Sequence, residues 1–343
     1  MTSGSSSGPR VLGPVDMDMG YLMRALAKYN ASDLHLKVGR PPLFRVNGKV
    51  VAAKMPELKS DTLAKIILPV MSERHRQELE RVRQVDFSFR IADLGRFRCN
   101  VFYQRDSLAA AIRMIPLTVP QFDSLGLPPV IKELCEKPRG LVLVTGATGT
   151  GKSTTLAAMI QHMNETSAGH ILCIEDPIEF IFKDRKSTIT QRELGTDTLD
   201  FKAALRAGLR QDPDVLMIGE LRDFETIQLA MTAAETGHLV FGTIHTNDSV
   251  GTIQRIVDVF PPESKNQARV QLASTLLAII SQQLVLRADG AGRMPACEVM
   301  IKSPVIEAAI LSGDLSRIPE MIDSSRDYYR MQSMNQALEE LVR

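Results

Sequence analysis

The residues with the clearest capacity for chemistry form the stretch GATGTGKSTTL, residues 146–156, which directly follows the apolar run LVLVT. The stretch fits the pattern G-x-x-x-x-G-K-[ST] in full and lies between a predicted strand and a predicted helix, the context that a phosphate-binding loop requires. Backbone N–H groups of such a loop close around phosphate oxygens, and the positive end of the helix points at the same anion. A glycine-rich turn without a nucleotide is the alternative interpretation. We predict that this loop binds ATP or GTP.

The residue types within the loop suggest individual contacts. We expect Lys152 to reach the β- and γ-phosphates of the nucleotide and the hydroxyl of Ser153 to bind Mg²⁺. The predicted nucleotide-binding residues are Gly146, Ala147, Thr148, Gly149, Thr150, Gly151, Lys152, Ser153 and Thr154.

Acidic residues and a histidine follow three further apolar runs. Glu175 and Asp176 come at the end of ILCIE, Glu220 follows VLMIG, His245 follows LVFGTI, and Glu179 stands three residues after Asp176. Because the carboxyl ends of parallel strands meet at one edge of a sheet, these side chains are expected to converge on the phosphate-binding loop. A single acid at a strand end is more often a helix cap, but three such positions beside an intact loop favour a hydrolytic site.

Arginines crowd into a short part of the N-terminal region, at positions Arg90, Arg96, Arg98, Arg105 and Arg113. On a strand, Arg96 and Arg98 would face the same way. A solvated surface is the alternative for each arginine. A one-sided cluster in a domain without its own phosphate-binding loop suggests arginine fingers, delivered from one subunit to the nucleotide of the next. This interpretation predicts an oligomeric ring.

The pattern along the chain predicts two domains. Residues 1–16 are small and polar and are expected to be a flexible leader, and residues 17–115 suit an α+β domain with strands in LFRVNGKVV and FSFRIADLGRFRCNVFYQR. Residues 116–129, with several prolines, are expected to be an interdomain linker. From 130 to 343, buried strands alternate with helices, which predicts a parallel sheet covered on both faces. We expect a long helix from Glu263 to about Arg287 and a helical tail.

Composition limits the partners and the compartment. The net charge of +1 over 343 residues does not indicate nucleic acid or anionic lipid as a bulk partner. The most apolar segment, VQLASTLLAIISQQLVL, contains polar residues and falls short of the ~20 apolar residues of a membrane span. The four cysteines, at positions 99, 135, 173 and 297, are too dispersed for a zinc site and are typical of reduced cytosolic thiols. These features predict a cytoplasmic protein.

The motifs together resemble those of the secretion-superfamily ATPases. CIEDPIEF resembles their aspartate box, MIGELRDFET their Walker B segment, and TGHLVFGTIHTND their histidine box. Within the superfamily the chain is similar to the type IV pilus retraction motors, the PilT/PilU family, from about Met19 to Leu338. The similarity includes ASDLHLKVGRPPLFRVNG, GRFRCNVFYQR and TQRELGTDTLDFKAALRAGLRQDPDV.

This resemblance implies a fold and roles for the site residues. It implies an α/β protein with a PAS-like N-terminal α+β domain and a RecA-like P-loop ATPase domain with a parallel sheet. Glu220 takes the place of the Walker B acid at the magnesium-bound water, and Glu179 that of the general base. His238 and His245 are the two histidines of the histidine box. His238 should lie at the opposite edge of the sheet from His245, and a purely structural role is the alternative for His238. Arg98, Arg105 and Arg113 become candidate trans or interdomain arginines.

The resemblance also implies an activity and partners. It implies a homo-hexamer that hydrolyses ATP with Mg²⁺ to power pilus retraction and twitching motility. The implied partners are an inner-membrane platform protein, reached from the cytoplasmic face, and a paralogous retraction ATPase; nucleic acid is not expected.

Two alternatives stay open at the level of sequence. The AIRNLIRE motif of the retraction motors is represented only by VIEAAILSGD, residues 305–314, which favours a PilU-like accessory ATPase dependent on a principal motor. A nucleic-acid translocase could use the same core, although no stripe of alternating basic and aromatic residues supports it. The sequence does not decide between the PilT and PilU paralogues, the ring symmetry, the pilus system or whether the chain ends naturally.

Overall fold

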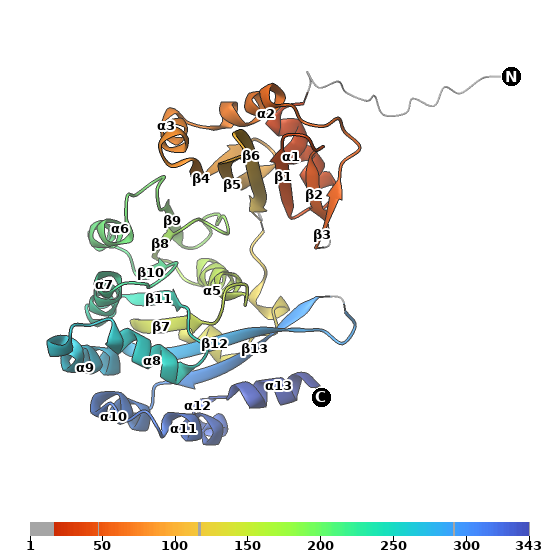
Figure 1. The fold of residues 1–343 in the computed structure, drawn as a ribbon. Coiled ribbons are helices and arrows are strands. Elements are labelled where there is room, and N and C mark those ends of the chain that lie inside the picture. The colour runs from red at the N-terminus through yellow and green to blue at the C-terminus, as the bar shows by residue number, and fades with distance from the viewer. Residues whose placement is uncertain (1–16, 47, 116–117, 291, 343) are drawn as a thin grey trace. The chain divides into compact units, whose positions relative to one another are not determined.

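The computed structural model describes residues 17–46, 48–115, 118–290 and 292–342. The chain divides into two compact units, the first ending at residue 117 and the second beginning at Thr118 (Figure 1). The first unit is α+β with an antiparallel sheet, and the second is α/β with a mostly parallel sheet, which confirms the predicted fold class. The expected leader, residues 1–16, lies outside the described residues.

An antiparallel six-stranded sheet forms the base of the first unit, in the order β3-β2-β1-β6-β5-β4. The strands are β1 Asp33–Lys37, β2 Leu43–Val46, β3 Lys49–Ala52, β4 Gln84–Ile91, β5 Gly95–Gln104 and β6 Ser107–Ile115. The helices are α1 Met19–Lys28, α2 Ser60–Ile67 and α3 Glu73–Val82, with the 3₁₀ turn η1 Leu68–Val70. Side chains alternate along β5, so Phe97 and Cys99 enter a core shared with Leu22 of α1, while Arg98 stays exposed.

The second unit contains a seven-stranded sheet in the order β13-β12-β7-β11-β10-β8-β9. The strands are β7 Gly140–Thr145, β8 His170–Glu175, β9 Thr188–Glu193, β10 Val215–Ile218, β11 Leu239–Ile244, β12 Leu276–Leu286 and β13 Arg293–Ile301. All neighbouring strands are parallel except β12 and β13. The four strands predicted from apolar runs correspond to β7, β8, β10 and β11.

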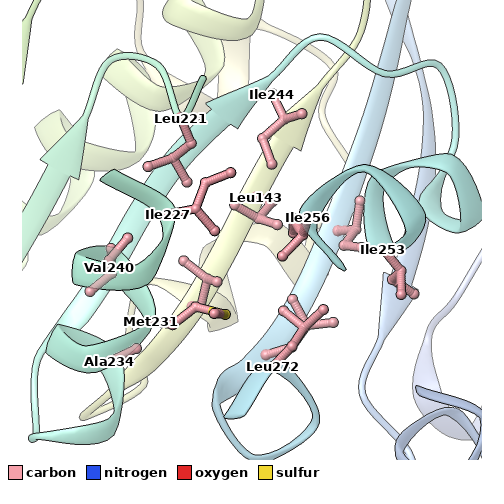
Figure 2. Close-up of a cluster of buried hydrophobic side chains, with 14 of the residues drawn as sticks. Leu143, Leu221, Ile227, Met231, Ala234, Val240, Ile244, Ile253, Ile256 and Leu272 are labelled. Atoms are coloured by element: carbon pink, nitrogen blue, oxygen red, sulfur yellow. The ribbon is translucent and has the colours of Figure 1, made fainter. Parts of the chain in front are cut away.

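Helices cover this sheet on both faces. They are α4 Val130–Leu134, α5 Lys152–Thr166, α6 Phe201–Gly208, α7 Phe224–Glu235, α8 Ser249–Asp258, α9 Lys265–Thr275, α10 Pro304–Ser312, α11 Ile318–Ser324, α12 Arg326–Tyr329 and α13 Met334–Val342, with the 3₁₀ turns η2 Phe122–Ser124 and η3 Pro262–Ser264. Leu143 of β7 packs against Ile227 and Met231 of α7 on one face (Figure 2), whereas the next residue, Val144, packs with Met159 of α5 on the other. The continuous apolar character of β7 therefore follows from burial on both faces.

The prediction of a long helix from Glu263 to about Arg287 was wrong. Helix α9 ends at Thr275, and residues 276–286 form β12, which pairs with β7 and β13. Branched aliphatic side chains suit a strand that is buried between two neighbours, and these long-range pairings override the local helical pattern. The apolar segment that we compared with a membrane span is thus the end of α9 followed by the whole of β12. Within the described ranges, none of the helices combines the length and the apolar character needed to cross a bilayer.

The region expected to be a linker contributes to the second unit. Residues 116 and 117 are not described, but Phe122 of η2 and Leu127 are buried in the same core cluster as α4 and α5. The prolines interrupt regular structure in this segment without keeping it out of the core.

The four cysteines are free thiols in the two cores. Cys99 lies in the first unit, and Cys135, Cys173 and Cys297 lie in the second. Burial raises the thiol pKa in each case, for Cys135 and Cys297 to about 12. At neutral pH the thiols are therefore protonated and act as small apolar side chains.

Candidate active site

The phosphate-binding loop joins the end of β7 to the start of α5, as predicted. Two of its glycines are required by close neighbours. Gly146 has φ +143°, and a Cβ there would lie 2.5 Å from the carbonyl oxygen of Gln282. Gly151 has φ +91°, and a Cβ there would lie 2.8 Å from the side-chain nitrogen of the same glutamine. Side chains at these two positions would distort the loop.

Lys152 begins α5 and is largely buried. Its Nζ donates hydrogen bonds to the carbonyl oxygens of Gly146 and Ala147, at 2.8 and 2.9 Å. Burial lowers the pKa of Lys152, and the negative charges of Glu220 and Glu179 partly oppose this effect. The ammonium group is thus held at the mouth of the loop, the position needed to contact a bound phosphate.

The aspartate-box segment places Glu179 beside the loop. The Ser153 hydroxyl donates a hydrogen bond of 2.9 Å to Glu179 Oε1. The turn after β8 contains a cis peptide bond between Asp176 and Pro177. Its backbone is held by Glu193 of β9, whose carboxylate accepts a hydrogen bond from the N–H of Ile178 at 3.0 Å.

Glu220 and His245 meet at the ends of the adjacent strands β10 and β11. Glu220 Oε1 lies 3.2 Å from His245 Nε2 and 2.6 Å from Arg222 Nε, while His245 Nδ1 lies 3.5 Å from Lys152 Nζ. Burial opposes ionisation of Glu220, but the hydrogen bond and charge of Arg222, together with His245, outweigh it and lower its pKa. Glu220 is therefore a carboxylate, and His245 links it to Lys152.

Glu175, the last residue of β8, occupies a different environment. It is 7% exposed and accepts hydrogen bonds from Gln191 Nε2 at 3.0 Å and from the N–H of Glu179 at 3.4 Å. Burial raises its pKa to about 7 despite these donors, and the nearby charges of Glu179 and Glu193 add to the rise. Its contacts are those of a residue that supports the turn carrying Glu179.

His238 lies at the other end of β11 from His245, as its position before the strand predicts. Its Nδ1 is 3.0 Å from the carbonyl oxygen of Ala233 and 3.4 Å from the hydroxyl of Thr236. The structure thus brings His245 to the phosphate-binding loop and leaves His238 at the opposite edge of the sheet of the same subunit.

Four of the predicted arginines, Arg90, Arg96, Arg98 and Arg113, share one face of the sheet of the first unit. Arg98 of β5 is opposite Arg113 of β6, and Arg113 is opposite Asp33 of β1. Arg98 and Arg113 are both exposed, but Arg113 Nε forms an ion pair of 2.7 Å with the buried Asp33. Arg105 is exposed in the turn between β5 and β6. Of these predicted arginines, Arg113 therefore has a structural partner within its own unit.

Three residues near the loop were not predicted. Arg222 pairs with Glu220, and Gln282 of β12 and Thr155 of α5 form a hydrogen bond of 2.7 Å beneath the loop. The sequence signal for Gln282 was the polar triplet Ser281-Gln282-Gln283 inside an otherwise apolar run. The sequence analysis placed this triplet in a helix. The pairing of β12 with β7, which brings Gln282 to the loop, joins residues more than a hundred positions apart and is not visible in the local sequence.

The side chains at this edge suit a magnesium ion. The Ser153 hydroxyl and the carboxylates of Glu179 and Glu220 supply hard oxygen ligands, the type that Mg²⁺ prefers. The donor set therefore fits the predicted role of Ser153 and Glu220.

The chain is similar to known proteins over nearly its whole length. The sequence profile described as Type II/IV secretion system protein matches residues 12–336. The chain is 45% identical to the type IV pilus retraction ATPase PilT of Pseudomonas aeruginosa, covering 95% of this chain and 94% of PilT. It is 39% identical to PilU of the same organism, covering 95% and 85%.

A solved structure extends the similarity to the fold. The crystal structure of the pilus retraction motor PilT with bound ADP superimposes with a TM-score of 0.89 and 47% identity, covering 95% of this chain and 93% of that one. The matched profile and the two relatives span both units. The chain therefore belongs to the type II/IV secretion system protein family.

Proposed function

We propose that this chain is an ATP-hydrolysing motor that powers type IV pilus retraction and twitching motility. The observation that carries the proposal is the meeting of Lys152, Ser153, Glu179, Glu220 and His245 at one edge of the sheet. The 45% identity to a pilus retraction ATPase over nearly the whole of both chains supports the specific process.

The geometry supports a distinct role for each residue. The loop N–H groups and Lys152 bind the β- and γ-phosphates of ATP. Ser153 and Glu220 would hold Mg²⁺, which when bound neutralises charge on the phosphate oxygens. Glu179 acts as the general base that takes a proton from the attacking water. His245 keeps the Glu220 carboxylate and the Lys152 ammonium in a fixed relation, because its two ring nitrogens face one group each.

The positive charge still needed at the γ-phosphate would come from another subunit. We assign this role to Arg98 or Arg105, which are exposed in the first unit; Arg113 has the weaker claim because it is paired with Asp33. The functional form is then a homo-hexamer in which each neighbour completes a site. Hydrolysis would change the relation between the two units of each subunit and so produce mechanical work.

The proposed location is the cytoplasm, docked at the cytoplasmic face of the inner membrane. The partners are a platform protein of the pilus machine and a paralogous retraction ATPase. Co-purification of the hexamer with the platform protein tests this part of the proposal, and failure to associate in the presence of ATP would contradict it.

Turnover assays on single variants test the hydrolytic mechanism. Lys152→Ala and Glu220→Gln should each lower ATP turnover by about 100-fold or more. The first removes the ammonium group that contacts the phosphates, and the second removes the negative charge that would hold Mg²⁺. Glu179→Gln should bind ATP normally but also lose about 100-fold in turnover, as expected for loss of a general base. Exposed Glu263→Gln is the matched control and should keep the wild-type rate. Unchanged turnover in both Lys152→Ala and Glu220→Gln would refute the mechanism.

A PilU-like accessory role is the second candidate. The segment VIEAAILSGD, which lacks the arginines of the retraction-motor motif, supports it and forms α10 with its glycine cap. Complementation separates the two roles. Restored twitching in a strain that lacks only its principal retraction motor would establish an autonomous motor, and restoration only in the presence of that motor would establish an accessory subunit.

A further inference from the structure

Gln282 is the central residue of a polar triplet, Ser281-Gln282-Gln283, in the otherwise aliphatic strand β12. It is 3% exposed, and both ends of its side-chain amide are used. Nε2 donates a hydrogen bond of 2.8 Å to the carbonyl oxygen of Thr150, and Oε1 accepts one of 2.7 Å from the hydroxyl of Thr155. Burial of an amide costs free energy unless its hydrogen bonds are made, so this arrangement fixes the side chain in one orientation.

The two partners of Gln282 belong to the phosphate-binding loop and to the helix that follows it. Thr150 is in the loop itself, and Thr155 is in the first turn of α5. Strand β12 runs parallel to β7 with Ser281 opposite Thr145, so Gln282 lies level with the first residue of the loop. The loop is folded directly against Gln282, because Gly146 lies close to its backbone carbonyl and Gly151 lies close to its side-chain amide.

We infer that Gln282 is a positioning residue for nucleotide binding, because it sets the orientation of the peptide group between Thr150 and Gly151. In a planar trans peptide the C=O and the N–H point in opposite directions. With the Thr150 carbonyl held by Gln282, the Gly151 N–H points away from β12, into the interior of the loop, where it can donate to a phosphate oxygen. The inference rests on the proposed binding of nucleotide by this loop.

The hydrogen bond to Thr155 adds a second constraint. It ties the same amide to α5, whose first residue is Lys152. The loop and the helix that carries the lysine are therefore held to one side chain on a neighbouring strand. Loss of Gln282 should loosen the loop relative to Lys152 and weaken the binding of the β-phosphate.

Binding measurements on the full-length protein test the inference. We would measure the Kd for ADP with Mg²⁺ by calorimetry, and the thermal unfolding temperature without nucleotide, for Gln282→Glu and Gln282→Met. The carboxylate of the first variant would face the Thr150 carbonyl instead of donating to it, and the second lacks both polar ends while keeping an unbranched chain. Both should raise the Kd about tenfold, which corresponds to about 1.4 kcal/mol. Gln283→Glu, the same change at the adjacent exposed position, is the control and should leave the Kd unchanged.

A purely structural role predicts a different result. It would lower the unfolding temperature of the Gln282 variants and leave the ADP affinity of the folded protein within twofold of the wild type, which would overturn the inference. Thr155→Val, which removes only the partner hydroxyl, provides a milder variant if the others do not fold. It should raise the Kd by a few fold, and an unchanged Kd would count against the inference. Absence of ADP binding by the wild type would instead refute the proposed function.

Discussion

Glu175 and Glu179 lie four residues apart in the aspartate box but occupy opposite environments. Glu179 is exposed and bonded to Ser153, whereas Glu175 is buried beneath the turn and its pKa is raised to about 7. The sequence placed both acids at the end of β8 and predicted their convergence with Glu220 and His245. It could not separate their roles, because the difference depends on β9, where Gln191 donates a hydrogen bond to Glu175 and Glu193 lies opposite it.

Replacement of Glu175 should change the pH dependence of stability. Because the folded-state pKa lies above the ordinary value of 4.5, the stabilising contribution of this group is fully present below pH 4.5 and is lost as the pH rises through about 7. Glu175→Gln cannot ionise, so it should not show this loss. Between pH 5 and pH 8.5, the free energy of unfolding of the variant should therefore increase relative to that of the wild type by up to about 3 kcal/mol. Urea unfolding at both pH values measures the gain. The same substitution at exposed Glu263 is the control, and an equal effect there would rule out the explanation.

Strand β12 shows where the prediction of helices and strands from the sequence fails in this chain. The strands β7, β8, β10 and β11 were predicted because each is a short, doubly buried run bounded by turns. The run LLAIISQQLVL follows a helix without a break, so its local pattern allowed either structure. Its pairing with β7, from which it is separated by more than a hundred residues, decided the outcome.

Strand β13 was not predicted either, and one of its residues fixes the start of a helix. Glu298 Oε1 accepts hydrogen bonds from the backbone N–H and the hydroxyl of Ser249, at 2.8 and 2.7 Å. Ser249 is the first residue of α8, where backbone N–H groups have no partner within the helix. The segment that leads into α8 begins with His245, so this contact holds the histidine-box loop to the sheet.

Removal of the Glu298 side chain should destabilise this part of the second unit. Glu298→Ala leaves the N–H of Ser249 without its partner and should lower the free energy of unfolding by about 1–3 kcal/mol. Glu298→Gln retains an acceptor oxygen and should lose less than half of that amount. Urea denaturation followed by circular dichroism measures both values. Equal losses in the two variants would show that the carboxylate charge, and not the hydrogen bonds to Ser249, is responsible.

At the scale of the whole molecule, the sequence predicted two domains, and the structure divides into two compact units. The proline-rich segment illustrates the remaining difference, since Phe122 and Leu127 join the core of the second unit. Prolines indicate that a segment lacks regular secondary structure. Which unit the segment belongs to is determined by the tertiary contacts of its apolar residues. Assembly into a hexamer is a property of surfaces between copies, so it stays a prediction.

Mixing two inactive variants tests whether subunits complete one another's sites. Arg98→Ala is preferable to Arg113→Ala, because loss of Arg113 would leave the buried Asp33 without its closest ion pair. Lys152→Ala and Arg98→Ala should each have low ATP turnover alone. In a mixture, some sites would combine an intact Lys152 with an intact arginine from the neighbour, so turnover should exceed the sum of the separate rates. No excess, despite subunit exchange shown with differently tagged copies, would exclude Arg98 as a trans residue.

The burial of all four cysteines makes the native chain a convenient starting point for fluorescence work. Their protonated thiols should react slowly with maleimide dyes, so a reporter cysteine placed on the exposed surface of each unit would carry the label without replacement of any natural one. Energy transfer between two such dyes during ATP turnover would then follow the movement of one unit against the other directly.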